Sequence, residues 1–326
     1  MTFIRSIRRL AIAACATAVL APCLAAQATW PDRPIKLIVP FAPGGSNDNI
    51  ARLIAVKLGE RLGQPIVVDN RGGAGGTIGT DVVVRSPADG YTLLFASSSI
   101  TTNASIGKKL SYDPIKDLAP IGEIGAGPFV IVVANEVKAK SLRELIDLAR
   151  AKPRSIGYGS AGIGGLNHLG TELFASEAKV ELLHVPYKGI SLAFTDLMAG
   201  NLQMLLPSLA SAVPQIRAGA MRALAVTSAQ RSPLAPDIPT TAEAGLPGFQ
   251  LDVWWGLVGP ARLPAPVVKR LNDELNAVLR LPDVNTLLAR EAATAKPGSP
   301  EAFGTLVRDD FARWTQLTKN LHIETE

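Results

Sequence analysis

Cysteine is almost absent from this chain. Of 326 residues only two are cysteines, Cys15 and Cys23, and both lie among the first thirty residues. The rest of the chain cannot form a disulfide, so it must rely on its apolar core, which a chain of this length can supply. A lipid anchor is disfavoured, because Pro22 directly precedes Cys23 and only a very short apolar stretch precedes Cys15.

Long apolar runs are absent beyond the N-terminus. Residues 1–28 begin with Arg5, Arg8 and Arg9, continue with an apolar stretch over 10–20, and end in Ala26-Gln27-Ala28. This pattern is typical of a secretory signal peptide cleaved after Ala28. The stretch is too short for a transmembrane helix, and no later segment is apolar over the roughly eighteen residues that such a helix needs. We therefore expect a soluble, exported protein of the periplasm.

Clustered basic residues are also lacking. The three arginines of residues 1–28 carry three of the five positive charges in the formal net charge of +5, so the remainder carries +2. No Lys/Arg tract follows residue 28. Nucleic acid is therefore not expected as a partner, because its recognition needs a basic patch.

The residues that usually carry catalysis are few. The chain has three histidines, His168, His184 and His322, and contains no H-E-x-x-H, G-x-S-x-G or G-x-x-x-x-G-K-[ST] motif. His168 and Glu172 have helical i, i+4 spacing, but two ligands are too few for a zinc site. We expect no catalytic residue, no metal site and no cofactor.

One motif argues for a nucleotide cofactor. Residues 157–162 match G-x-G-x-x-G, and Glu177 and Glu181 follow about twenty residues later, as in dinucleotide-binding proteins. The context disfavours this interpretation. The strand before the motif is short, the motif lies in the middle of the chain, and nicotinamide cofactors belong to the cytoplasm.

The most informative stretch is residues 35–52. Leu37, Ile38 and Val39 form an apolar run that predicts a buried strand, and apolar residues at helical spacing begin at Ile50. Residues 43–48 lie between them and read Pro-Gly-Gly-Ser-Asn-Asp, whose last three members are good helix N-caps. A strand, a glycine turn and a helix N-terminus can form an anion site, because the first helical N–H groups lack partners.

The same arrangement recurs along the chain. Glycine-rich turns at 43–48, 72–77 and 159–165 each follow a predicted strand and precede a predicted helix, and a hydroxyl-rich loop at 97–103 follows another strand. Alternating strands and helices predict parallel sheets, whose ligands bind at the carboxyl ends of the strands. Backbone N–H groups in such turns can bind a small anion.

Two proline-bearing tracts, near 110–125 and 228–250, are natural crossovers between lobes. They predict an α/β protein with the two-lobed periplasmic binding protein fold, two crossovers and a ligand cleft between the lobes. We expect lobe 1 to comprise 29–122 plus 250–326 and lobe 2 to comprise 123–249. Such an architecture closes about a hinge.

Several motifs lie along the chain after residue 28. They are Val39-Pro40-Phe41-Ala42-Pro43-Gly44-Gly45 with Asp48 and Ala51-Arg52, Asn70-Arg71-Gly72-Gly73-Ala74-Gly75-Gly76, Gly159-Ser160-Ala161-Gly162 with His168 and Glu172, Pro186-Tyr187-Lys188-Gly189, and residues 222–227. Together they resemble the Bug family, the periplasmic solute-binding receptors of tripartite tricarboxylate transporters, and the resemblance covers essentially the whole chain after residue 28.

The resemblance implies two α/β lobes around a cleft, with ligand carboxylates held by main-chain amides and ordered waters at strand-end loops. It also implies membrane transporter components as partners, and we expect a monomer. Loops near 97–103 and 205–209 are expected to choose between ligands. The expected ligand-binding residues are Ala42, Gly44, Gly45, Ser46, Asp48, Gly75, Gly76, Thr77, Ser98, Ser160, Gly162, Gly164, Gly165, His168, Tyr187, Lys188, Gly189 and Ser208.

An alternative is an exported α/β hydrolase-like enzyme acting on a small carboxylated substrate. It would need Asp48 or Ser160 beside a general base, and the sequence identifies no such base. The receptor hypothesis accounts for the signal peptide, the crossovers and the glycine turns together.

Overall fold

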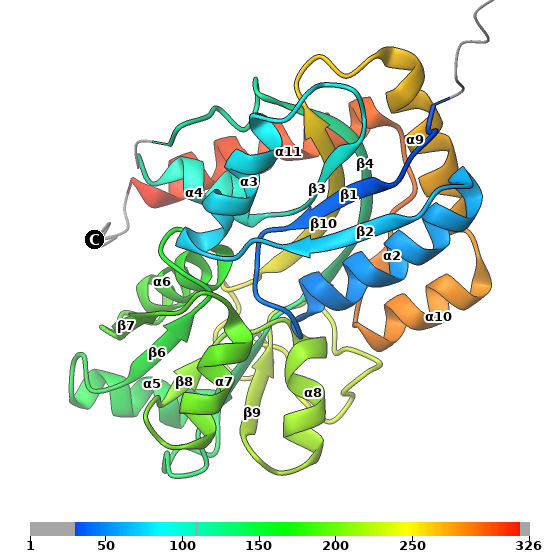
Figure 1. The fold of residues 1–326 in the computed structure, drawn as a ribbon. Helices are drawn as coiled ribbons and strands as arrows, with labels where there is room; N and C mark the ends of the chain where they lie inside the picture. The colour runs from blue at the N-terminus through cyan, green and yellow to red at the C-terminus, as the bar shows by residue number, and fades with distance from the viewer. Residues whose placement is uncertain (1–29, 108–109, 320–326) are drawn as a thin grey trace, which may run out of the picture.

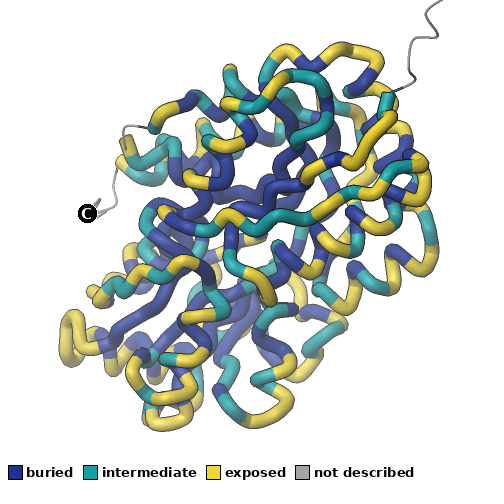
Figure 2. The backbone as a smooth tube through the Cα atoms, in the orientation of Figure 1, coloured by how far each residue is buried: buried dark blue, intermediate teal, exposed yellow. Residues whose placement is uncertain are grey.

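The computed structural model describes residues 30–107 and 110–319, so the expected signal peptide at 1–28 lies outside the described residues. Two β-sheets, each covered by helices, form an upper and a lower lobe in Figure 1. The central strands are buried, whereas the edge strands β2 (Ile66–Asn70) and β7 (Leu183–Pro186) and the outer faces of the helices are partly exposed (Figure 2). None of the helices among the described residues is long and apolar enough to cross a membrane.

The first sheet has six strands, and β1 pairs in parallel with β2 and β3 as predicted. The sheet is nevertheless mixed and not purely parallel, because β10 pairs antiparallel with β3 and β4, and β11 pairs antiparallel with β4. In spatial order the strands are β11 (Thr294–Ala295), β4 (Leu118–Pro128), β10 (Asp252–Pro260), β3 (Thr92–Ser97), β1 (Ile35–Val39) and β2 (Ile66–Asn70). The associated helices are α2 (Ser46–Leu62), the 3-10 helix η1 (Ala74–Gly76), α3 (Thr77–Val84), α4 (Ser99–Ser105), α9 (Ala265–Leu279), α10 (Pro282–Arg290) and α11 (Pro300–Thr318).

The second sheet has five strands, and β6 pairs in parallel with both β7 and β8. In spatial order they are β7 (Leu183–Pro186), β6 (Gly157–Ser160), β8 (Met204–Leu205), β5 (Val130–Val133) and β9 (Arg222–Val226). Its helices are α5 (Leu142–Ala151), α6 (Leu166–Ala178), α7 (Ile190–Met198) and α8 (Leu209–Arg217).

Side-chain alternation explains the layers of the first sheet. Successive residues of a strand point to opposite faces, and accordingly Leu93 packs in one apolar cluster with α2 and α9, whereas Leu94 packs in another with α3 and α11. Trp255 and Trp254 of β10 divide in the same way. The second sheet follows the same rule with α5 and α6 on one face and α7 and α8 on the other.

The chain crosses between the sheets twice. The second crossing, between β9 and β10, coincides with the predicted tract at 228–250. The first crossing differs from expectation, because the second half of the predicted tract, from residue 118 on, belongs to the long strand β4, which pairs with β10 from Leu118 to Pro128. The chain therefore enters the second sheet at Phe129. The lobe boundaries at 122/123 and 249/250 stay a prediction.

Several local expectations need correction. The hydroxyl-rich stretch after β3 forms helix α4 and not a loop, and the helix predicted after the glycine turn at 72–77 begins already at Thr77. Thr240 and Glu243 form the reciprocal bonds of a capping box, Glu243 N to Thr240 Oγ1 at 3.1 Å and Thr240 N to Glu243 Oε2 at 2.8 Å, but only a turn follows. Helix α8 and strand β11 were not predicted.

Candidate functional site

A pocket of about 530 Å³, its open mouth included, lies where the ends of the two sheets meet. Both lobes contribute to it, and its lining contains no Lys, Arg, His, Asp or Glu. The lining residues are Phe41, Ala42, Gly45, Ser46, Asn47, Ser97, Ser99, Phe129, Ala161, Leu166, Asn167, Ile190, Ser191, Ser208, Val253 and Trp255.

The turn between β1 and α2 shapes one wall of the pocket. Gly44 has a φ of +89°, a left-handed conformation that glycine adopts without strain. Gly45 is the N-cap of α2, in an extended conformation and with no side-chain cap, so Ser46, Asn47 and Asp48 lie inside the first turn and none is the predicted N-cap. The N–H groups of Ser46 and Asn47 belong to the first turn, which has no helical acceptors.

Asp48 stabilises this turn through its side-chain carboxylate. Its carboxylate accepts hydrogen bonds from Gly44 N at 3.1 Å and Asn70 Nδ2 at 3.0 Å, and it pairs with Arg52 at 3.0 Å. Burial raises the pKa of Asp48, but the bonds from Arg52, Asn70 and Gly44 outweigh burial, so the net pKa lies below its usual value. This carboxylate therefore stays ionised and serves the shape of the turn.

Five helices present their N-terminal residues to the pocket. Besides α2, these are α4 through Ser99, α6 through Leu166 and Asn167, α7 through Ile190 and Ser191, and α8 through its N-cap Ser208. Each helix N-terminus carries a partial positive charge and outward-pointing N–H groups. Partial positive charge from the backbone therefore faces the pocket, although no basic side chain lines it.

Hydroxyl groups of the lining join the lobes directly. Ser208 Oγ donates to Ser46 Oγ at 2.9 Å, Ser191 Oγ donates to the Pro43 carbonyl at 3.3 Å, and Leu166 N donates to Ser99 Oγ at 3.2 Å. Each of these bonds runs between an element of the first sheet and an element of the second. The structure therefore has the lobes in contact around the pocket.

The turns at 72–77 and 159–165 meet each other. A Cβ on Gly75 would lie 2.6 Å from the Ile163 carbonyl oxygen and 3.0 Å from Gly165 N, and a Cβ on Gly162 would lie 2.5 Å from Gly75 N. The two backbones approach closely here because neither carries a side chain. We call residues 72–76 and 162–165 the glycine contact.

Beneath this contact lies a buried cluster of polar rings. His168 and His184 stack with ring centroids 3.9 Å apart, Gly164 N donates to His168 Nδ1 at 3.1 Å, and His184 Nε2 lies 2.6 Å from Ser160 Oγ. Burial, followed by the charge of His184, lowers the pKa of His168 to about 3, and burial lowers that of His184 to about 4. Both rings are therefore neutral near pH 7.

This cluster supplies the base that the enzyme hypothesis lacked, since His184 contacts Ser160. The pair is nevertheless placed for structure. Ser160 is 0% exposed, its hydroxyl accepts a bond from Gly162 N at 3.1 Å, and it does not line the pocket. A nucleophile must reach its substrate. Among the described residues, no group of three or more His, Cys, Asp or Glu could hold a metal ion.

The predicted ligand-binding residues divide into three sets, and no observation tests their contact with a ligand. Ala42, Gly45, Ser46 and Ser208 line the pocket. Gly44, Asp48, Ser98, Ser160 and His168 support the loops around it, Ser98 by accepting from Trp254 N at 2.9 Å. The remaining residues lie at the lobe contact or outside it: Gly75, Gly76, Thr77, Gly162, Gly164, Gly165, Tyr187, Lys188 and Gly189.

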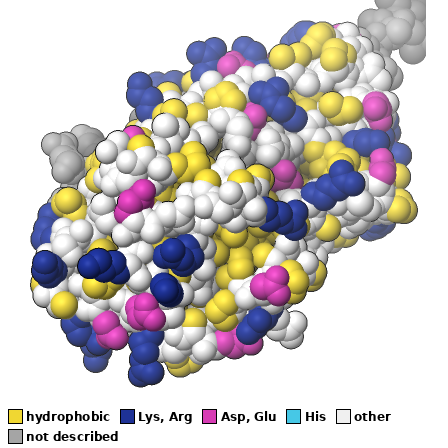
Figure 3. Space-filling view, turned by 90° about the horizontal axis from the view of Figure 1, so that it is seen from below, with side chains coloured by type: hydrophobic (Ala, Val, Ile, Leu, Met, Phe, Trp, Pro, Cys, Tyr) yellow, Lys and Arg dark blue, Asp and Glu magenta, His cyan; other side chains and the backbone are white. Residues whose placement is uncertain are grey.

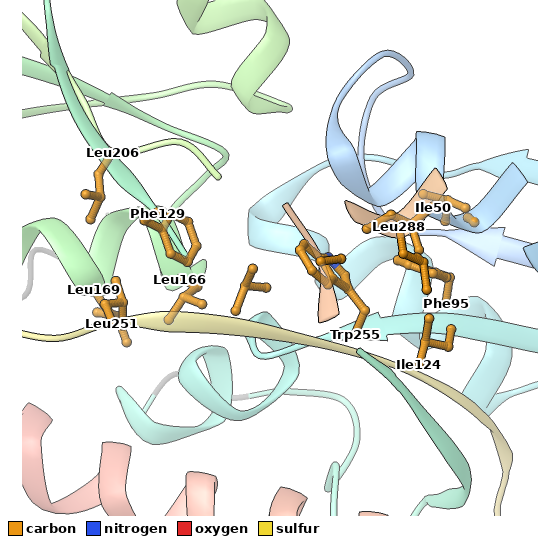
Figure 4. Close-up of a cluster of buried hydrophobic side chains, with 14 of the residues drawn as sticks. Ile50, Phe95, Ile124, Phe129, Leu166, Leu169, Leu206, Leu251, Trp255 and Leu288 are labelled. Atoms are coloured by element: carbon orange, nitrogen blue, oxygen red, sulfur yellow. The ribbon is translucent and has the colours of Figure 1, made fainter. Parts of the chain in front are cut away.

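Sequence reasoning missed most of the apolar and amide lining. Phe129 lies at the first crossing, and Val253 and Trp255 lie in β10, just after the second. Figure 4 shows Trp255 between Phe129 and Leu166 on one side and Ile50 and Leu288 on the other. A signal for the asparagines existed, since Asn47 belongs to the predicted turn at 43–48 and Asn167 lies two residues after the predicted turn at 159–165.

The fold and the pocket between its lobes define a solute-binding receptor. The profile of the tripartite tricarboxylate transporter family receptor matches residues 50–323. BugT of Bordetella pertussis is 37% identical over 293 residues, which cover 89% of this chain and 90% of that protein. The chain therefore belongs to the tripartite tricarboxylate transporter receptor family, and the predicted resemblance to the Bug family is confirmed.

Solved structures agree with the two-lobed periplasmic binding protein fold. A Rhodopseudomonas palustris protein with adipate is 37% identical, with a TM-score of 0.86 and coverage of 89% of this chain and 97% of that chain. MatC from Rhodopseudomonas palustris, with bound malate, is 32% identical, with a TM-score of 0.85 and coverage of 89% and 100%.

Proposed function

We propose that this chain captures a small carboxylate in the pocket between its lobes and delivers it to the membrane components of a tripartite tricarboxylate transporter. It acts in the periplasm, as a monomer, and catalyses no reaction. In this proposal lobe 1 comprises the predicted 29–122 plus 250–326 together with 123–128, the remainder of strand β4, and lobe 2 comprises the rest of the predicted 123–249. The adipate and malate of the two related structures support a carboxylate as the ligand.

The observation that carries this proposal is the meeting of five helix N-termini at a pocket without charged side chains. A helix dipole stabilises an anion by roughly 0.3–1 kcal/mol, and by about 2 kcal/mol when partly buried. A hydrogen bond to a charged group adds roughly 1.5–3 kcal/mol. Micromolar affinity needs about 8 kcal/mol, so a few backbone N–H groups from both lobes suffice.

Nucleic acid is not a partner in this proposal. Figure 3 shows Lys and Arg in separate small groups with Asp and Glu between them, over the face seen from below. A carboxylate therefore finds its positive potential inside the pocket and not on this outer face. Two basic residues close to the glycine turns in sequence are consistent with this, since Arg71 pairs with Asp69 at 3.0 Å and Lys188 is exposed.

The variant Gly45→Val tests the carboxylate site. Gly45 lines the pocket with a φ of −94° that valine adopts readily, and its added Cβ would contact only Ile190 Cγ2, at 3.8 Å. The isopropyl group would occupy the space of the carboxylate, so we expect binding at least about a hundredfold weaker, from the loss of two charged hydrogen bonds. The measurement is isothermal titration with succinate, malate and adipate.

Gly298→Val is the matched control, because no atom lies within 4 Å of its added Cβ and it does not line the pocket. Arg71→Ala and Lys188→Ala should weaken binding less than about tenfold, as expected for exposed charges. Loss of binding in these two variants, with Gly45→Val unchanged, would mean that a side-chain salt bridge holds the ligand. Turnover of a carboxylate by the wild type would favour the enzyme.

Gly164→Val, which the sequence alone suggests as a second test, is unsuitable. Gly164 has a φ of +82°, and its added Cβ would lie 2.4 Å from Asn103 Oδ1. Such a variant would strain the turn and disturb its packing whether or not a ligand binds there.

A further inference from the structure

Two asparagine side chains line the pocket from opposite lobes. In each, one end of the amide group hydrogen-bonds to a protein group, and that bond fixes which of its two ends, oxygen or NH₂, faces the pocket. Asn47 belongs to the first turn of α2. Trp255 Nε1 donates to Asn47 Oδ1 at 2.7 Å. An indole N–H is a donor only, so it must meet the oxygen of the amide and leave the NH₂ group for the pocket.

Asn167 belongs to the first turn of α6, and its amide group has the opposite orientation to that of Asn47. Its Nδ2 donates to the Leu206 carbonyl at 2.5 Å. A carbonyl is an acceptor only, so it must meet the NH₂ group and leave Asn167 Oδ1 for the pocket. Trp255 is 1% exposed and Leu206 is 0% exposed, so packing holds both partners in place.

The free ends of both amides reach the pocket. Within residues 30–107 and 110–319, no protein group bonds to Asn47 Nδ2 or to Asn167 Oδ1. Neither atom is among the buried side-chain atoms that lack a partner, so both are accessible. The lobe 1 wall therefore offers a donor beside the N–H groups of α2, and the lobe 2 wall offers an acceptor.

We propose that these two locked amides select the ligand by hydrogen-bond polarity: Asn47 receives the carboxylate, and Asn167 receives a hydrogen-bond donor, a hydroxyl or ammonium group, on the same molecule. This inference rests on the proposed function and narrows its ligand class. A ligand lacking the donor would leave Asn167 Oδ1 unpaired once the closed lobes exclude water, which is unfavourable.

The test is isothermal titration with matched series that differ in one group: succinate, malate and aspartate, and propionate, lactate and alanine. The hydroxyl or amine member that fits should bind wild-type protein about five- to tenfold more tightly than the unsubstituted acid, the gain from one neutral hydrogen bond. Comparing the hydroxyl arm with the amine arm identifies which donor Asn167 accepts.

Variants separate the two amides. Asn167→Leu removes the acceptor at similar volume, so the preference for the substituted member should shrink to less than about twofold while the unsubstituted acids still bind. Asn47→Asp keeps an oxygen for Trp255 but turns the pocket-facing donor into an anion, so every carboxylate should bind at least about a hundredfold more weakly. Trp255→Phe frees the Asn47 amide to rotate and should weaken all members alike. Thermal unfolding confirms that each variant is folded.

The outcomes are distinct. Binding of the acids without preference for a donor, or a preference that survives in Asn167→Leu, would overturn the role of Asn167 and leave carboxylate capture intact. Unchanged affinity in Asn47→Asp would overturn the role of Asn47. Failure of all six acids and of adipate to bind the wild type would overturn the proposed function and this inference with it, whereas binding of adipate alone would overturn only this inference.

Discussion

At the scale of single residues, the stacked pair His168 and His184 lies in lobe 2 at a place where protonation is unfavourable. Their rings lie 3.9 Å apart and His168 is 1% exposed. A charged ring would lack hydration here because it is buried, and a proton on His168 Nδ1 would break the bond that this atom accepts from Gly164 N. The pair therefore ties the stability of the glycine contact to pH.

The first prediction is a loss of stability in mild acid. The native pKa values, about 3 and about 4, lie below the unfolded value of about 6.5. The unfolded chain therefore binds more protons as the pH falls from about 6.5 to 4, and the free energy of unfolding should drop by about 1–3 kcal/mol between pH 6 and pH 5. Urea unfolding followed by tryptophan fluorescence measures this drop.

The control is the double variant His168→Asn with His184→Gln, whose amides mimic the bonded ring nitrogens but do not titrate. Its free energy of unfolding should change less between pH 6 and pH 5 than that of the wild type. An equal slope in both proteins would show that other groups cause the acid sensitivity.

Residue types near the site were predictable, but their roles were less so. The glycines at 75, 162 and 164 were expected to let a ligand approach the backbone. In the structure they let the backbone or a side chain of the other lobe approach instead. The pairing of Asn47 with Trp255 joins residues 208 positions apart in the chain. Local spacing carries no information about such a contact, because it depends on how β10 returns to the first sheet.

At the scale of elements, side-chain caps decide where some helices begin. The sequence Ser-Leu-Arg-Glu at 141–144 predicts a capping box, and the structure confirms that α5 starts there, with Glu144 N donating to Ser141 Oγ at 3.2 Å. Ser299 caps α11 in the same way through Ala302 N at 3.2 Å. By contrast α2 begins at Gly45 without a side-chain cap, which leaves its N–H groups for a ligand.

The second prediction concerns the cap of α5. Ser141→Ala removes the acceptor for Glu144 N and should lower the free energy of unfolding by about 1 kcal/mol. Ser176→Ala, at an exposed position inside α6, is the control and should be neutral or slightly stabilising, because alanine is the better helix former. Equal losses in both variants would refute a specific capping effect. Denaturant unfolding at pH 7 measures the difference.

Elements with strong apolar patterns were predictable, whereas those defined by tertiary pairing were not. The apolar run at 37–39 predicted β1, which the structure extends by two residues to Ile35–Val39. Helix α4 has the sequence Ser-Ile-Thr-Thr-Asn-Ala-Ser, whose hydroxyl and amide side chains favour turns, and it forms because it packs on α11. Strand β4 contains prolines and glycines that indicate a loop, and it is held by its pairing with β10.

At the scale of the whole molecule, the lobes share an apolar core. One cluster includes Ile50 and Leu93 of the first lobe together with Leu169 and Phe174 of the second, and Trp255 lies between the two groups in Figure 4. The hydrogen bonds around the pocket and the glycine contact add further interactions between the two lobes. The two-lobed plan follows from the order of elements in the sequence, but this degree of contact depends on side chains from both lobes.

The last prediction is that closure depends on Gly189 meeting Ala42. Gly189 has a φ of 175°, an extended conformation open to any residue, yet its added Cβ would lie 2.8 Å from Ala42 Cβ and 3.2 Å from Ala42 N on the other lobe. Gly189→Val should therefore fold normally but keep the lobes apart. Small-angle scattering of the wild type with a saturating carboxylate should show a smaller radius of gyration than without it. The variant should keep the larger value and bind more weakly, while Gly298→Val should behave as the wild type. Equal compaction of Gly189→Val and wild type would show that this contact does not limit closure, since a hinge that closes must bring these two backbones together.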